Sequence, residues 1–129
     1  MKTARLFLVD DNADNLEVLA ILLREAYTVF TYGSAVEALR DLPSIKPDLL
    51  VLDIGMPTLD GVQCLQAIRA MPGWATIPAI AVTAFARDVE RKAFLEAGFQ
   101  AVVTKPVIDQ QELFDAIDRL LAPSAAMAS

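Results

Sequence analysis

The sequence predicts an α/β protein built on a single doubly wound, flavodoxin-like parallel sheet of five strands, in the order 2-1-3-4-5, with helices on both faces. Short apolar segments of strand length alternate with segments in which apolar residues recur every three or four positions. The connections between these segments are short, and 129 residues suit one domain with one substantial core. Such alternation gives parallel strands joined by right-handed crossovers.

The first half of the chain contains two predicted strand–helix units. Residues 6–9 form an apolar run that polar residues end, and leucines then recur at helical spacing over residues 16–23. The β-branched and aromatic run 27–32 predicts the second strand. Gly33 and Ser34 then supply a turn and a cap for the next helix.

The second half contains three further predicted strands, at residues 49–52, 77–82 and 101–104. The first of them is apolar on both faces, as a central strand of a parallel sheet requires. We expect residues 1–121 to form the domain and residues 122–129, which are mostly small, to form a disordered tail. The remaining helices are predicted around Val62–Ile68, over Arg87–Ala97 with Gly98 as its cap, and from a cap at Asp109 to Leu121.

Composition excludes several classes of function. Eleven basic and 17 acidic residues give a net charge of −6, which repels nucleic acid and anionic lipid, so we expect no nucleic-acid partner and no membrane partner. Although 55% of the residues are apolar, no run approaches the roughly 20 apolar residues of a membrane-spanning helix. The amino terminus also lacks the pattern of a signal peptide, and we therefore predict a cytoplasmic protein.

The chain contains no histidine and one cysteine, Cys64. Catalysis by a serine or cysteine paired with histidine is therefore excluded, as are histidine-ligated zinc, cysteine-rich zinc and an internal disulfide. We expect Cys64 to be a small core or half-buried residue on a helix. Any site must consequently use carboxylates, hydroxyls, lysine and a hard metal ion.

Polar residues end four of the five predicted strands. Asp10 and Asp11 follow the first strand, Asp53 the third, Thr83 the fourth and Lys105 the fifth. In such sheets ligands bind at the carboxyl ends of the strands, where the strand order reverses. Clustered carboxylates without histidine or cysteine suit Mg²⁺, and a lysine with a hydroxyl group suits phosphoryl oxygens. Each feature alone is typical of helix caps or turns, but their joint placement predicts a phosphoryl-acceptor site.

Four motifs follow one another along the chain: Val9-Asp10-Asp11-Asn12, Leu52-Asp53-Ile54-Gly55-Met56-Pro57 with Asp60-Gly61, Val82-Thr83-Ala84 and Thr104-Lys105-Pro106. As a set, in this order, they resemble the motifs of the receiver domains of bacterial two-component systems, and the resemblance extends from Arg5 to Leu121. It implies that Asp53 accepts a phosphoryl group, which Thr83 and Lys105 contact. The implied Mg²⁺ ligands are Asp10, Asp11, Asp53 and the backbone carbonyl of Gly55.

The resemblance also implies a function. The phosphoryl donor would be a histidine kinase or a histidine phosphotransfer protein, and the domain would signal through protein contacts made by its fourth helix, fifth strand and fifth helix. We expect no effector domain, no catalysis beyond the chain's own phosphorylation and dephosphorylation, and a monomer or weak dimer. Met1 lies a few residues before the first strand, which favours a free-standing protein over a receiver excised from a hybrid histidine kinase.

The sequence disfavours two other classes of protein. A phosphatase of the haloacid-dehalogenase type carries a second aspartate two residues after its nucleophile, where this chain has Gly55, which cannot move a proton. A pseudo-receiver, which has lost phosphorylation, would not be expected to keep all the acceptor-site residues.

The chain departs from the family pattern at two positions. Val102 replaces the usual aromatic residue, so we expect output to depend on the loop 83–87 rather than on a side-chain flip. Phe85 either shields an acyl phosphate from water or packs outward.

Among the other residues, Trp74 is predicted to anchor a loop at the far end of the sheet, and Phe94 and Phe99 are either core or docking residues. The charged residues predicted to form a solvated helix face are Arg87, Asp88, Glu90, Arg91 and Lys92.

Overall fold

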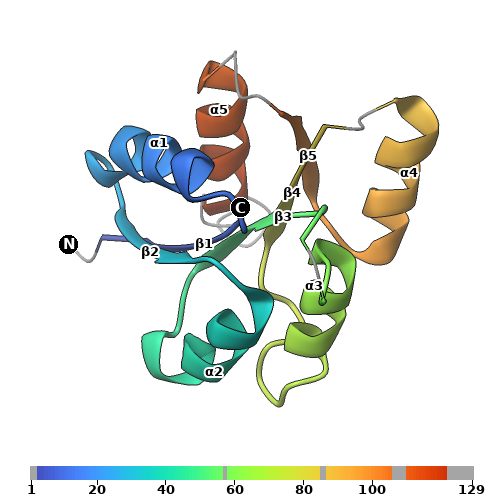
Figure 1. The fold of residues 1–129 in the computed structure, drawn as a ribbon, viewed down its shortest axis with the longest axis horizontal. Helices are drawn as coiled ribbons and strands as arrows, with labels where there is room; N and C mark the ends of the chain where they lie inside the picture. Colours follow the sequence, from blue (N-terminus) through green and yellow to red (C-terminus); the bar gives the residue numbers. More distant parts are fainter. Residues whose placement is uncertain (1–2, 57, 85–86, 106–109, 122–129) are drawn as a thin grey trace, which may run out of the picture.

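The structure, a computed structural model, describes residues 3–56, 58–84, 87–105 and 110–121. Within these ranges five strands alternate with five helices (Figure 1), and none of the described helices combines the length and hydropathy needed to cross a membrane. The elements are β1 (Arg5–Val9), α1 (Ala13–Arg24), β2 (Thr28–Tyr32), α2 (Ala35–Ile45), β3 (Leu49–Asp53), α3 (Gly61–Arg69), β4 (Ala79–Thr83), α4 (Asp88–Ala97), β5 (Ala101–Thr104) and α5 (Gln110–Leu121).

The strands form one parallel sheet in the order β2-β1-β3-β4-β5, which confirms the predicted fold. Val9 lies opposite Leu52, and Asp53 lies opposite Val82, so β1, β3 and β4 end at nearly the same level. Because all strands run in one direction, the residues that follow them meet at a single edge of the sheet.

Helices cover both faces of the sheet (Figure 1). α1 and α5 pack on one face, whereas α2, α3 and α4 lie on the other. β3 and β4 are buried along their whole length, as strands covered on both sides must be. The largest fully buried side chains are Phe7, Leu6, Leu8, Leu23, Leu42, Leu49, Leu50, Leu52, Leu65, Ile68, Ile80 and Leu113.

Proline and helix caps account for the small differences in element boundaries. β4 begins at Ala79 rather than at the predicted residue 77, because Pro78 has no N–H for a sheet hydrogen bond. Ser34 caps α2 as predicted, accepting a hydrogen bond from the N–H of Glu37 at 3.2 Å. The helix predicted over 87–97 starts at Asp88, with Arg87 as its cap. The predicted cap at Asp109, Phe85 and the tail 122–129 lie outside the described residues.

The structure also decides which of the singled-out apolar residues belong to the core. Cys64 is fully buried, as predicted, and burial raises the pKa of its thiol to about 11. Phe99 is buried and Phe94 packs against the same core, so both are core residues rather than a separate docking surface. Trp74, in the turn before β4, packs against this core as the predicted loop anchor.

Two of the five charged residues predicted to form a solvated face, Glu90 and Arg91, are only partly exposed. Arg87, Asp88 and Lys92 are exposed, as expected of a solvated face. Arg91 is only partly exposed, because its side chain crosses to β5 and donates a 2.9 Å hydrogen bond to the carbonyl of Val102. A long side chain can lie over a neighbouring strand while its helix stays largely solvated.

Replacing Lys46 by glycine should stabilise the protein. Lys46 ends α2 in the left-handed conformation, with φ of 55°, and its N–H donates to the carbonyl of Leu42. Glycine adopts this conformation without the steric cost that a Cβ atom brings. We expect Lys46→Gly to raise the free energy of unfolding, measured in urea, by about 0.5–1 kcal/mol.

A glycine at the end of α1 provides the matched control. Glu25 ends that helix with φ of −66°, which any residue adopts. Glu25→Gly should therefore lower the free energy of unfolding by about 0.5–1 kcal/mol. A loss of stability in both variants would show that the left-handed backbone at Lys46 is not strained.

Candidate functional site

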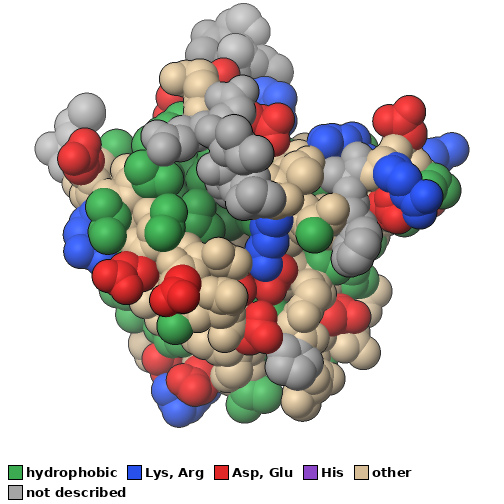
Figure 2. All heavy atoms as spheres, turned by 45° about the horizontal axis from the view of Figure 1, so that its top comes forward, with side chains coloured by type: hydrophobic (Ala, Val, Ile, Leu, Met, Phe, Trp, Pro, Cys, Tyr) green, Lys and Arg blue, Asp and Glu red, His purple; other side chains and the backbone are tan. Residues whose placement is uncertain are grey.

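Three carboxylates meet where β1 and β3 end. Asp10 follows β1 and is 3% exposed, while Asp53 ends β3 and is 4% exposed. Asp11 lies at the exposed rim, and each of the three offers an oxygen within 4.8 Å of the other two. Figure 2 shows acidic side chains gathered beside a basic one near the centre of this face. The carboxylate cluster predicted at the point where strand order reverses is therefore present.

Lys105 supplies positive charge to the two buried carboxylates. Its Nζ lies 2.9 Å from Asp53 Oδ1 and 3.3 Å from Asp10 Oδ2. Its backbone N–H donates to the carbonyl of Thr83 at 2.7 Å, which fixes the end of β5 to the end of β4. Burial alone would lower the pKa of Lys105, but the hydrogen bond to Asp53 and the charges of both aspartates raise it. Lys105 therefore remains an ammonium ion at neutral pH.

The charge of the cluster is not balanced by this lysine. Burial raises the pKa of Asp10, and the negative charge of Asp53 adds to the effect. Lys105 and the N–H of Asn12, which lies 2.9 Å from Asp10 Oδ1, act in the opposite direction without cancelling it. Three carboxylates thus face one ammonium group, and this all-oxygen donor set fits a hard divalent cation such as Mg²⁺.

The loop after Asp53 requires a glycine at position 61. The N–H of Gly61 donates to the carbonyl of Ile54 at 3.1 Å, so the start of α3 packs directly against the end of β3. A Cβ atom at position 61 would lie 2.5 Å from the carbonyl oxygen of Asp53. Asp60 and Gln63 cap each other's backbone N–H groups and hold this helix end in place.

An open cleft of about 330 Å³ gives access to Asp53. Thr83, at the end of β4, is buried in its wall, and Asp10 lies beside it in contact with Lys105. Asn15 was not foreseen as a site residue; the only signal was its place in the first turn of α1, capped by Asn12. The cleft is lined by Asp11, Asn12, Asn15, Asp53, Ile54, Gly55, Thr83, Ala84 and Lys105.

Comparison with known sequences agrees with this geometry. Residues 6–118 match the response regulator receiver domain family. A 14.6 kDa protein of Leptolyngbya boryana is 40% identical over 103 residues, covering 79% of each chain. The transcriptional regulatory protein PrrA of Mycobacterium leprae is 36% identical across the whole chain, which spans about half (54%) of that relative's length.

Solved structures show the same similarity. A response regulator from Chloroflexus aurantiacus J-10-fl superposes with a TM-score of 0.87 at 32% identity, covering 95% of this chain and 100% of the other. The receiver domain of the sensor histidine kinase PA1611 from Pseudomonas aeruginosa PAO1 gives a TM-score of 0.84 at 29% identity, with the same coverage of both chains. In that receiver domain a magnesium ion is coordinated in the active site cleft.

Adding a methyl group at position 61 should disturb both stability and the site. Because the new Cβ would clash with backbone rather than with a flexible side chain, α3 or the end of β3 must shift. We expect Gly61→Ala to lower the free energy of unfolding, measured in urea, by about 2–3 kcal/mol. Gly33→Ala is the control, since a Cβ there meets nothing within 4 Å, and it should change stability by less than about 0.5 kcal/mol. Equal effects of the two substitutions would contradict the close packing at Gly61.

Neutralising Asp10 should stabilise the metal-free protein. A pKa raised on folding means that the charged carboxylate destabilises the native state at neutral pH, and that this cost disappears as the pH falls through the folded pKa. With a chelator present, Asp10→Asn should raise the melting temperature by about 3–6 °C at neutral pH. The gain should vanish near the ordinary aspartate pKa of 3.8.

Asp11→Asn is the matched control, because it removes a carboxylate at the exposed rim. It should change the melting temperature much less than Asp10→Asn does. A lower melting temperature for Asp10→Asn at neutral pH would show that the ion pair with Lys105 outweighs the cost of burial.

Proposed function

The chain belongs to the response regulator receiver domain family, and from this membership we propose that it is a phosphoacceptor signalling module. Asp53 accepts a phosphoryl group from a histidine kinase or a histidine phosphotransfer protein in a reaction that depends on Mg²⁺. The phosphorylated domain then acts through protein contacts and turns over no external substrate beyond its phosphodonor. The cytoplasmic location expected from the sequence remains a prediction.

The observation that carries this proposal is the position of Asp53 at the base of an open cleft, in contact with Lys105. A carboxylate oxygen of Asp53 attacks the phosphorus atom while the bond from phosphorus to the donor's imidazole nitrogen breaks. The electron pair of that bond leaves with the imidazole. Lys105 lies where its charge can stabilise the phosphoryl oxygens, and Thr83 lines the same cleft.

The residues suited to hold Mg²⁺ are Asp10, Asp11, Asp53 and the backbone carbonyl of Gly55. The clustering of the three carboxylates supports this assignment, as does the magnesium ion in the similar receiver domain of PA1611. When bound, the ion would supply positive charge to the transferring phosphoryl group. Asp10 and Asp11 would help to hold the ion near Asp53. The ammonium group of Lys105 contacts the Asp53 carboxylate directly.

The chain acts either as a free-standing receiver or as the receiver segment of a longer protein. The similarity to the PA1611 receiver, which is part of a sensor histidine kinase, makes the second arrangement a specific alternative. The acceptor chemistry proposed for Asp53 is the same in both arrangements.

Phosphorylation by a small donor tests the proposal. With Mg²⁺ and acetyl phosphate, the intact chain should gain one phosphoryl group by mass spectrometry, and alkali or hydroxylamine should remove it, because an acyl phosphate is labile to both. Asp53→Asn should not be labelled, since an amide is not a nucleophile. Chelation of the metal or Asp11→Ala should slow labelling strongly, because fewer carboxylates then hold a metal that dehydrates reluctantly.

Asp14→Asn is the control, because Asp14 is an exposed aspartate in the first turn of α1, outside the carboxylate cluster. This variant should be labelled like the unsubstituted protein. Stable labelling of Asp53→Asn, or label on a hydroxyl residue, would contradict the mechanism.

A further inference from the structure

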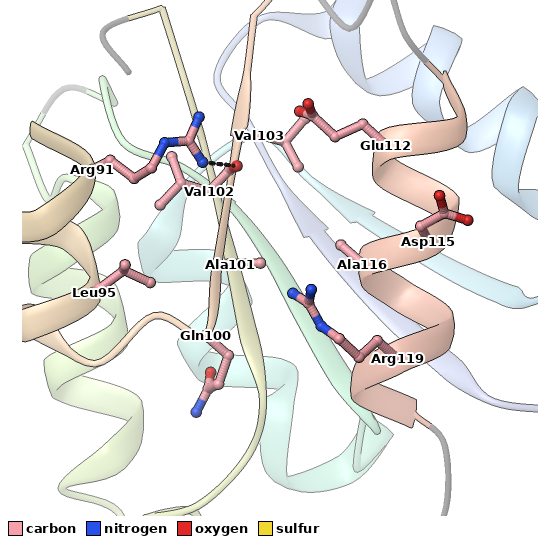
Figure 3. A pocket seen from close by; sticks show the side chains of 10 residues that line it. All are labelled: Arg91, Leu95, Gln100, Ala101, Val102, Val103, Glu112, Asp115, Ala116 and Arg119. Carbon is pink, nitrogen blue, oxygen red and sulfur yellow. Dashed lines mark hydrogen bonds between the residues drawn. The ribbon is translucent and has the colours of Figure 1, made fainter. Parts of the chain in front are cut away.

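Helices α4 and α5 leave a groove of about 380 Å³ above β5, and one side chain crosses part of it (Figure 3). Arg91 extends from α4 to the strand, where its Nη1 lies 2.9 Å from the carbonyl oxygen of Val102. The Val102 side chain is apolar and buried in the core, so the carbonyl is the polar group that this position offers to α4. Arg91 therefore joins the helix to the backbone of the strand.

The two ends of α4 are attached to the rest of the molecule very differently. None of its residues is fully buried. Near its carboxyl end Phe94 packs against the core, and the carbonyl of Gly98 accepts a 2.7 Å hydrogen bond from Arg69. Toward its amino end, within the part of the chain that the structure describes, the bond from Arg91 is the side-chain hydrogen bond that reaches the sheet. Arg87, by contrast, bonds within the helix, to Glu90.

The carbonyl to which Arg91 donates belongs to β5, the strand that leads into the site lysine. Val102 pairs with Ala81 of β4, and three residues later Lys105 is fixed to Thr83 by a 2.7 Å backbone hydrogen bond. Lys105 Nζ lies 2.9 Å from Asp53. A phosphoryl group on Asp53 would draw Lys105 from the carboxylate to the new oxygens, and the strand end would follow.

We propose that Arg91 is a positioning residue. Its hydrogen bond holds α4 against β5 in the arrangement in which Lys105 pairs with Asp53, and this bond thereby opposes phosphorylation of Asp53. This inference rests on the function proposed for Asp53. A contact that stabilises one of two arrangements sets the ratio between them, and a ligand that favours the other arrangement must overcome it. Removing this hydrogen bond should therefore favour phosphorylation of Asp53 and raise the affinity of the site for a mimic of the phosphoryl group.

The affinity for beryllofluoride, a stable mimic of the phosphoryl group, measures this effect. Arg91→Met keeps an apolar stem but has no donor, and it should bind beryllofluoride about three- to tenfold more tightly in the presence of Mg²⁺. Amide exchange should become faster in α4 and stay unchanged in α5. Arg91→Lys restores a charged donor and should return the affinity to within about twofold of the unsubstituted chain.

Two control variants distinguish the loss of the Arg91 hydrogen bond from a general effect of removing positive charge. Lys92→Ala removes a positive charge from the exposed neighbour of Arg91 on the same helix, and Arg119→Ala removes the arginine on the α5 wall of the groove. Both should bind beryllofluoride within about twofold of the unsubstituted chain, because exposed charges contribute little. Melting temperatures identify any variant whose folding has changed.

The outcomes are distinct. Unchanged or weaker binding by folded Arg91→Met would overturn the role of Arg91, and so would an equal gain in Lys92→Ala. If the unsubstituted chain itself neither accepted phosphate on Asp53 nor bound beryllofluoride, the proposed function would fail, and this inference would fail with it.

Discussion

The pairing of one ammonium group with two buried carboxylates is the interaction on which the rest of the site depends. Burying Asp10 and Asp53 is unfavourable unless a cation and hydrogen bonds compensate for the lost water, and Lys105 compensates only part of it. Asp10 follows β1 and Asp53 ends β3, whereas the lysine follows β5. These three groups meet only if the strands between them end at the same level, so the order and register of the sheet are conditions for the site's electrostatics.

The same constraint explains why the backbone beside the site must adopt a particular conformation at the start of α3 and in the turn after β1. The start of α3 must lie against the end of β3 to shape the loop after Asp53, and a glycine at position 61 makes this approach possible. On the other side, the turn after β1 directs the N–H of Asn12 onto Asp10 before α1 begins. The charge that remains unbalanced in the cluster is a source of instability at neutral pH, and it is also what attracts a cation.

The sequence predicted the fold and the grouping of the site residues because both depend on simple patterns. Apolar periodicity marks helices and strands, and the ends of parallel strands necessarily share one edge of the sheet. The contact of Arg91 with β5 could not be predicted in this way, because a long flexible side chain on a half-buried helix can point to water or across a neighbour. The alternatives for Phe94 and Phe99 stayed open for the same reason, since they depend on how closely α4 approaches the sheet. The clash at Gly61 depends on a helix–strand distance that no local pattern encodes.

Stability is distributed unevenly over the molecule, and this bears on how the domain could respond to a change at Asp53. β3 and β4 are buried throughout, so a small free energy cannot rearrange them. α4 buries no residue completely, and among the described residues it is Arg91 whose side-chain hydrogen bond joins its amino-terminal half to the sheet. A valine at position 102 offers no polar or aromatic group to move, yet its carbonyl still connects the strand to this weakly held helix. The place where a modest free energy can alter the surface is therefore the attachment of α4 rather than the side chain of Val102.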